Sequence, residues 1–351
     1  MSSTSAGKSF QNLPRDAKQC LRAAMSCLKQ RDAKGARQNL LKIEFGNTLA
    51  PFHRLMAAAA VLDDDFNLAQ SHLEQAISID PASQALRAEC AIISRRVNEP
   101  ERSEELLDSI NLNSCMTVAD FIRCGNAFLA CDRFHMAAAA FEQGLAISPY
   151  DTLLRHRYAV SLTCTDAYDQ AQSQWETCLK YNPKHVDALA SLGSLLCYKN
   201  QLPDAIALFN KARRSDELED KRVVMLNLID AYCKQGSLDE AQSLLLELED
   251  RAPEPRYYYL WATLMMKRGE NKLAASNLHR CSELLTSVIG RENNPIRDID
   301  SESAIASDLD RTVADSVRKL EALLNPLMTI KALRRKAIDE LEISESSGDY
   351  R

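Results

Sequence analysis

The stretch Val186–Ala212, VDALASLGSLLCYKNQLPDAIALFNKA, holds two amphipathic helix patterns joined by a short polar turn. Gly193 lies in the first pattern, and Ala205, Phe209 and Ala212 lie in the second. Small side chains allow two helices to cross closely. Phe209 lies four residues after Ala205 and three before Ala212, so all three share one stripe of the helix. The stretch therefore predicts a tight helical hairpin.

The same pattern recurs along the 351 residues. Prolines follow four amphipathic helices, at Pro81, Pro149, Pro183 and Pro253. An alanine lies twelve residues before each proline, at Ala69, Ala137, Ala171 and Ala241, and a large apolar residue follows four residues later, at Leu73, Phe141, Trp175 and Leu245. In this frame units begin near Ala17, Ala50, Gln84, Val118, Thr152, Val186, Arg222 and Pro255. The offsets of 33, 34, 34, 34, 34, 36 and 33 residues predict an internal repeat.

This pattern resembles the tetratricopeptide repeat (TPR) family. The resemblance implies an all-α, right-handed superhelical solenoid of about eight helical hairpins with a concave inner surface. The first, third and last units lack the terminal proline and have Thr48, Cys115 and Thr286 there. The third unit also has Ser103 in place of the second-helix alanine, which predicts a local bend or looser packing.

The sequence divides into five predicted segments. We expect a flexible N-terminal tail over 1–16, the TPR-like solenoid over 17–288 and a polar linker over 289–307. C-terminal capping helices, interrupted by Pro326, are predicted over 308–341, and a flexible tail over 342–351.

Composition indicates a soluble, cytoplasmic protein. The 43 basic and 49 acidic residues are mixed along the chain, which makes nucleic-acid wrapping a poor expectation. The longest apolar run, Leu55–Leu62, is too short to span a membrane, and no secretory signal is expected at the N-terminus. Eleven cysteines without a CxxC motif indicate reduced thiols.

No catalytic motif is found: there is no glycine-rich phosphate loop, HExxH or GxSxG. We therefore expect no enzyme activity, no cofactor and no metal site. Cys131 and His135 are four residues apart, as metal ligands on one helix can be, but a core thiol beside a surface histidine is the simpler interpretation. Most other cysteines fit core positions, whereas Cys197 and Cys233 fall on the groove side of a first helix, which leaves a reactive thiol open there.

A partner-binding groove is implied by the resemblance, since the family lines its inner surface with positions 2, 5, 9 and 12 of each first helix. The predicted groove residues are Ile122, Asn126, Leu129, His156, Val160, Asp187, Ser194, Leu226, Asp230, Arg256, Tyr259 and Met266. This set is apolar with isolated polar groups, which suits an amphipathic helix or an extended peptide. The alternative is that some of them only pack against the neighbouring hairpin.

The clamp by which some family members hold the acidic C-termini of heat-shock chaperones is not expected. It needs lysines, asparagines and an arginine at five positions over three successive units. Here Asn126 matches, but Ile122, Arg157, Asp187 and Ser191 occupy the other positions.

The predicted function is a non-enzymatic scaffold or adaptor for a protein or peptide ligand. The alternatives are a chaperone for a secreted or assembly substrate, a regulatory subunit of an enzyme complex, or an enzyme with its site in residues 289–351. A nucleic-acid-binding repeat would need a positive groove, and the predicted lining has no such excess. The basic segment Lys331–Lys336 could meet an acidic partner, although a solvated helix face is the simpler interpretation.

Overall fold

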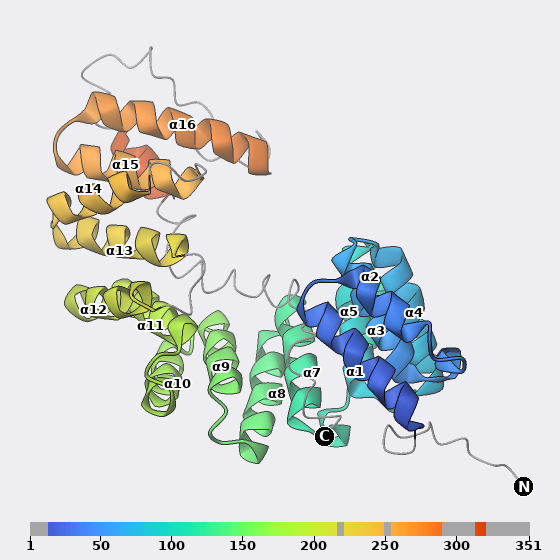
Figure 1. Cartoon of the computed structure of the whole chain (residues 1–351). Coiled ribbons are helices and arrows are strands. Elements are labelled where there is room, and N and C mark those ends of the chain that lie inside the picture. The colour runs from blue at the N-terminus through green and yellow to red at the C-terminus, as the bar shows by residue number, and fades with distance from the viewer. Residues whose placement is uncertain (1–12, 216–220, 249–253, 290–312, 321–351) are drawn as a thin grey trace, which may run out of the picture. The chain divides into compact units, whose positions relative to one another are not determined.

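The computed structural model describes residues 13–215, 221–248, 254–289 and 313–320, and within these ranges the secondary structure is helical, with no strand. The described residues divide into two compact units, one that ends at Ala167 and one that begins at Tyr168. We call them the N-terminal unit and the C-terminal unit, and Figure 1 labels their helices. Each is a stack of antiparallel helical hairpins, as the repeat pattern predicts.

The N-terminal unit contains α1 (Arg15–Lys29), α2 (Ala33–Leu40), α3 (Ala50–Leu62), α4 (Phe66–Ile79), α5 (Gln84–Arg96), α6 (Pro100–Asp108), α7 (Val118–Ala130), α8 (Phe134–Ile147) and α9 (Thr152–Cys164). The C-terminal unit contains α10 (Tyr168–Tyr181), α11 (Val186–Tyr198), α12 (Leu202–Arg213), α13 (Arg222–Gln235), α14 (Leu238–Glu247), α15 (Pro255–Lys267) and α16 (Asn271–Ile289). From α3 to α15, every odd-numbered helix begins at the residue that the repeat frame predicts, and α1 begins two residues early.

The turn inside each hairpin is fixed by one residue in the left-handed backbone region. Positive φ angles occur at Arg31, Asp64, Asn98, Asp132, Asp166, Asn200, Gly236 and Gly269. Their spacing reproduces the offsets of the helix starts. Glycine, asparagine and aspartate tolerate this conformation better than most residues, so every turn except that at Arg31 has a suitable residue there.

The signature residues of the repeat form the core, as predicted. Phe141, Trp175 and Phe209 are fully buried, as are the alanines twelve residues before each proline. Gly193 lets Phe209 approach α11, because a β-carbon added at Gly193 would lie 2.7 Å from Cε1 of Phe209. The glycine is therefore needed for close packing within this hairpin.

The substitution Gly193→Ala is expected to destabilise the C-terminal unit. Alanine favours a helix by about 1 kcal/mol, but overpacking against Phe209 costs about 1–3 kcal/mol. Urea unfolding should show a lower free energy of unfolding for Gly193→Ala. The double variant Gly193→Ala/Phe209→Leu should lose less free energy of unfolding than the sum of the two single variants, because the smaller leucine relieves the overpacking. A single variant as stable as the original chain would contradict this packing.

The first and third units have shortened second helices. Here α2 has 8 residues and α6 has 9, whereas α4, α8 and α10 have 14 each. A short 3₁₀ turn follows each shortened helix, at Gly46–Thr48 and Leu112–Ser114. Ser103, at the alanine position of the third unit, is buried and donates a hydrogen bond to the carbonyl of Ala91 at 2.8 Å.

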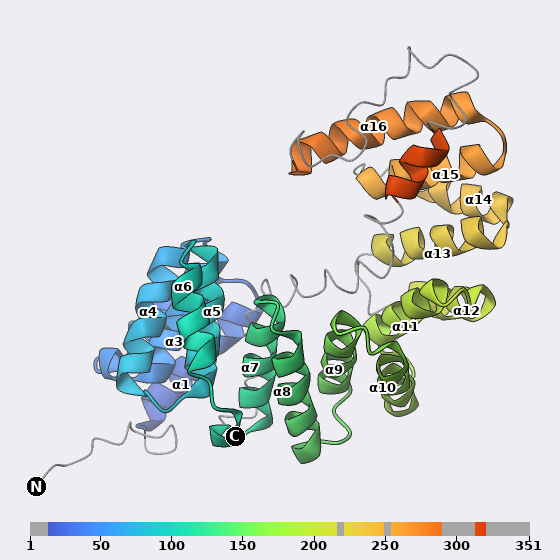
Figure 2. The same ribbon diagram turned by 180° about the vertical axis from the view of Figure 1, so that it is seen from behind.

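One helical segment beyond α16 is described, over 313–320, and it lies beside α15 in both views (Figures 1 and 2). Val313, Val317 and Leu320 of this segment are buried. The predicted linker begins at 289, which is the last residue of α16. The predicted tails (apart from 13–16), the rest of the linker, the rest of the capping helices and the basic segment at 331–336 lie outside the described residues.

Candidate functional site

Most of the predicted groove residues are buried within their own unit. The buried ones are Asn126, Leu129, His156, Val160, Ser194, Leu226, Asp230 and Tyr259. Ile122, Arg256 and Met266 are half-buried, and Asp187 is exposed. Apolar members such as Leu226, with 1% exposure, therefore pack between helices and present little surface to a partner.

The polar groups of the C-terminal unit gather on the face formed by its first helices α11, α13 and α15. The amide nitrogen of Asn227 donates a hydrogen bond to Oγ of Ser194 at 3.0 Å, and that hydroxyl donates to the carbonyl of Ala190 at 2.9 Å. Asn227 was not among the predicted lining residues. Its only signal in the sequence is an amide within the apolar run VVMLNLI.

One turn after Asn227, Asp230 brings a buried carboxylate to the same face. It is 3% exposed, and its Oδ2 lies 3.1 Å from Nζ of Lys234. Arg256 on α15 is the next charge. Burial lowers the pKa of Arg256, and the negative charge of Asp230 opposes this effect.

These side chains leave buried polar atoms without hydrogen bonds. The acceptor is Oδ1 of Asn227 and the donors are Nε and Nη2 of Arg256, whereas the buried Oδ2 of Asp230 has the ion pair with Lys234. A buried polar atom left unsatisfied costs about 1–3 kcal/mol, and folded proteins contain few of them. We name Ser194, Asn227, Asp230 and Arg256 the polar cluster.

The two thiols predicted on this side are not activated. Cys197 and Cys233 are 5% and 0% exposed, respectively. Burial, reinforced by the charge of Asp230, raises the pKa of each thiol to about 12. Both are therefore protonated near neutral pH, which argues against the reactive thiol left open by the sequence.

In the N-terminal unit the first-helix charges pair with each other. Glu89 on α5 accepts from Nε of Arg54 at 2.8 Å and lies 3.3 Å from Nε of Arg123. Arg157 on α9 donates to Oδ1 of Asn126 at 2.5 Å. Asn126 and Arg157 both occupy positions of the chaperone clamp, and here they bond to each other.

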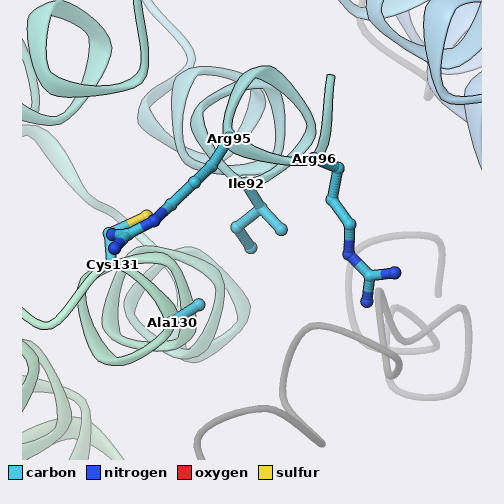
Figure 3. Close-up of a pocket in the computed structure, with 5 residues that line it drawn as sticks. All are labelled: Ile92, Arg95, Arg96, Ala130 and Cys131. Carbon is cyan, nitrogen blue, oxygen red and sulfur yellow. The ribbon is translucent and has the colours of Figure 1, made fainter. Parts of the chain in front are cut away.

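A small pocket lies at the C-terminal ends of α5 and α7 (Figure 3). Its volume is about 190 Å³, and its lining is Ile92, Arg95, Arg96, Ala130 and Cys131. Arg95 runs along the Cys131 sulfur and reaches Asp132 at 3.2 Å, whereas Arg96 points away and its guanidinium carbon lies 5.2 Å from the ring centre of Phe66. The pocket is smaller than the usual 300–1,000 Å³ of ligand sites.

Two histidines, the buried His53 and the half-buried His72, lie against each other between α3 and α4. The Nδ1 atoms of His53 and His72 are 3.1 Å apart, and Nε2 of His53 lies 3.1 Å from the carbonyl of Asn47. The described residues contain no group of three or more side chains placed to hold a metal ion. None of the described helices has the length and apolar character to cross a bilayer.

This pair predicts that the N-terminal unit loses stability in mild acid. The pKa of His72 is lowered from its usual 6.5, first by burial and then by His53 and Arg37, with a smaller opposing hydrogen bond to Gln75. The unfolded chain therefore binds more protons, so this contribution is fully present above about pH 7 and declines as pH falls below about 6.5. As pH is lowered through that range, the urea concentration at the unfolding midpoint should fall in the original chain and fall less in His72→Gln. An equal dependence of the midpoint on pH in both proteins would contradict the assignment of this effect to His72.

Comparisons with known proteins agree with this fold. A PPR repeat model matches residues 223–251, which cover α13 from its second residue and all of α14. No curated protein matches the chain. Among solved structures, a tetratricopeptide repeat protein from Parabacteroides merdae aligns with a TM-score of 0.53 at 14% identity, over 76% of this chain and 98% of its own.

Two further solved structures are similar over shorter stretches. The type IV pilus biogenesis factor PilW aligns at TM-score 0.49 and 18% identity, over 57% of this chain and 92% of its own. YrrB, a TPR protein with an unusual peptide-binding site, aligns at TM-score 0.37 and 17% identity, over 49% and 89%. The helix pattern and the first of these comparisons establish an all-helical repeat protein with the tetratricopeptide fold.

Proposed function

We propose that this chain is a protein-interaction scaffold or adaptor, without catalytic activity, that binds a segment of a partner protein on the first-helix face of the C-terminal unit. The observation that supports this most is the polar cluster. Its members leave an acceptor and donors unsatisfied within the buried packing of α11, α13 and α15. These atoms are buried in the free chain, so a ligand that offers both kinds of group would offset that cost once the side chains covering them move aside.

An extended peptide fits these requirements better than a helix. Each main-chain peptide group carries one N–H donor and one C=O acceptor, and in an extended segment both are free to bond outward. In a helix the interior groups already bond to each other. Asn227 would accept from an N–H of the peptide, and Arg256 would donate to one of its carbonyls.

Other functions receive less support from the cluster. An enzyme would need a nucleophile or a proton-transfer pair, and the nearby thiols Cys197 and Cys233 have raised pKa values. A nucleic-acid site would need a basic excess, whereas Asp187 and Asp230 balance Lys234 and Arg256 on these helices. A chaperone or a regulatory subunit would use the same face, and no described feature favours either role over a scaffold.

We propose a cytoplasmic location. All eleven cysteines are free, including the neighbouring pair Cys115 and Cys124. Free thiols throughout a chain of this kind are typical of a reducing compartment.

The proposal can be tested with a displayed peptide library selected on the purified full chain. The selected peptides should bind Arg256→Met about 10-fold or more weakly, because that change removes one or two hydrogen bonds worth about 1 kcal/mol each. The matched control is Arg213→Met, which removes the same charge from the α12 surface, where Arg213 pairs with Glu247 at 3.4 Å. Failure to select any peptide, or equal weakening by both variants, would contradict the proposed site.

A further inference from the structure

Two thiols of the N-terminal unit lie against each other where the repeat is irregular. Cys115 follows the 3₁₀ turn Leu112–Ser114 and occupies the place of the terminal proline in the third unit. Cys124 lies in the following helix, α7. The two Sγ atoms are 3.9 Å apart, within reach of a sulfur hydrogen bond.

The two cysteines differ in access to solvent. Cys115 is 9% exposed and lies in a non-helical connector between exposed residues, one of which, Met116, is 82% exposed. Cys124 is fully buried on the core side of α7. An oxidant arriving from solvent would therefore meet Cys115 first.

The pair is also electrically asymmetric. The hydrogen bond between the two sulfurs lowers the pKa of Cys115 below the usual value of 9.0, although burial and the charge of Asp120 oppose it. The same contact and burial raise the pKa of Cys124. Elsewhere, burial raises the pKa of Cys90 to about 11 and that of Cys281 to about 12.

We propose that Cys115 and Cys124 form a dithiol that is oxidised to a disulfide by hydroperoxides. The Cys115 thiolate attacks a peroxide oxygen, the O–O bond breaks, and hydroxide leaves and takes up a proton, so that Cys115 becomes a sulfenic acid. Cys124 then attacks the Cys115 sulfur, the S–O bond breaks, and a water molecule leaves with the thiol proton. With hydrogen peroxide the sum is two thiols and one peroxide giving one disulfide and two waters.

The fold permits this step with a local movement. The sulfurs must close from 3.9 Å to about 2.0 Å. Cys124 is held by α7, whereas Cys115 lies outside any helix, so the connector supplies the adjustment. The disulfide would tie the end of the irregular third unit to the helix that starts the fourth, independently of peptide binding in the other unit.

The test is disulfide mapping of the folded full chain after treatment with hydrogen peroxide. Free thiols are alkylated, the chain is digested, and the peptides are identified by mass spectrometry. The expected product is a cross-link between Cys115 and Cys124, while Cys90 and Cys178 stay alkylated as free thiols. The proposal is overturned if both members remain free at peroxide levels that oxidise the half-buried Cys20, or if Cys115 pairs with another cysteine.

Single variants distinguish the cysteine that attacks the peroxide, Cys115, from the cysteine that then forms the disulfide, Cys124. In Cys124→Ser, Cys115 should persist as a sulfenic acid that dimedone labels, and in Cys115→Ser, Cys124 should stay a free thiol. The control variant Cys164→Ser should retain the cross-link. Circular dichroism melting checks each fold, and if a variant does not fold, the map of the original chain still decides the outcome.

Discussion

Replacing Trp175 with alanine is expected to lower the free energy of unfolding of the C-terminal unit by about 3–5 kcal/mol. The indole of Trp175 on α10 is fully buried and is the largest side chain in the core. Removing it forfeits the burial of the ring and leaves a cavity that the neighbouring helices fill only in part. Urea unfolding followed by circular dichroism measures the loss.

The variant Trp175→Phe serves as the control, because a phenylalanine occupies the same position at Phe141 and Phe209. Trp175→Phe should lose less than half of the free energy of unfolding that Trp175→Ala loses, since phenylalanine fills more of the site. A loss below about 1 kcal/mol for Trp175→Ala would show that this side chain does not hold the hairpins together.

The second large effect is expected from Glu89→Gln in the N-terminal unit. The Glu89 carboxylate lies between Arg54 and Arg123, and the three side chains are 8%, 14% and 13% exposed. Neutralising the carboxylate removes the counter-charge that the two guanidinium groups share in a place with little water, although Arg123 keeps the more distant Asp120 at 4.0 Å. Breaking a buried pair in this way costs about 3–5 kcal/mol, and the incomplete burial here favours the lower end.

A matched control is Asp132→Asn, which removes a carboxylate from Arg95. Both of these side chains are 43% exposed, so a change of about 1 kcal/mol or less is expected. The two variants should also respond differently to salt, because an exposed pair is screened more strongly than a buried one. Similar losses in both variants would contradict the distinction between the buried and exposed pairs.

The helix boundaries could be predicted because the repeat is encoded locally. Residues such as Gly193 and Phe209 combine a small and a large side chain at fixed spacing, and that combination is compatible with few arrangements other than a tight hairpin. The left-handed turn residues carry the same period and would have strengthened the prediction. The shortened α2 and α6 fall in units that lack the terminal proline, but the last unit also lacks it and its α16 has 19 residues, so the missing proline alone does not predict a short helix.

The candidate site was less predictable. Family positions placed Leu226 and Tyr259 on the groove side, but their exposures of 1% and 4% depend on how neighbouring hairpins pack, which periodicity does not specify. Charged replacements at these two residues would therefore unfold the unit rather than report on binding. Asn227 was missed because its significance lies in an unsatisfied acceptor that only the three-dimensional packing shows.

The central claim is that the polar cluster is kept for binding rather than for stability. The most direct measurement compares unfolding free energy and peptide affinity in Asn227→Leu, which is close in shape and removes the unsatisfied oxygen. If the claim is right, stability is unchanged or rises by up to about 1 kcal/mol, while selected peptides bind about 10-fold or more weakly. A variant that is destabilised by more than about 1 kcal/mol and binds the same peptides with unchanged affinity would show that Asn227 is structural and that the binding surface lies elsewhere.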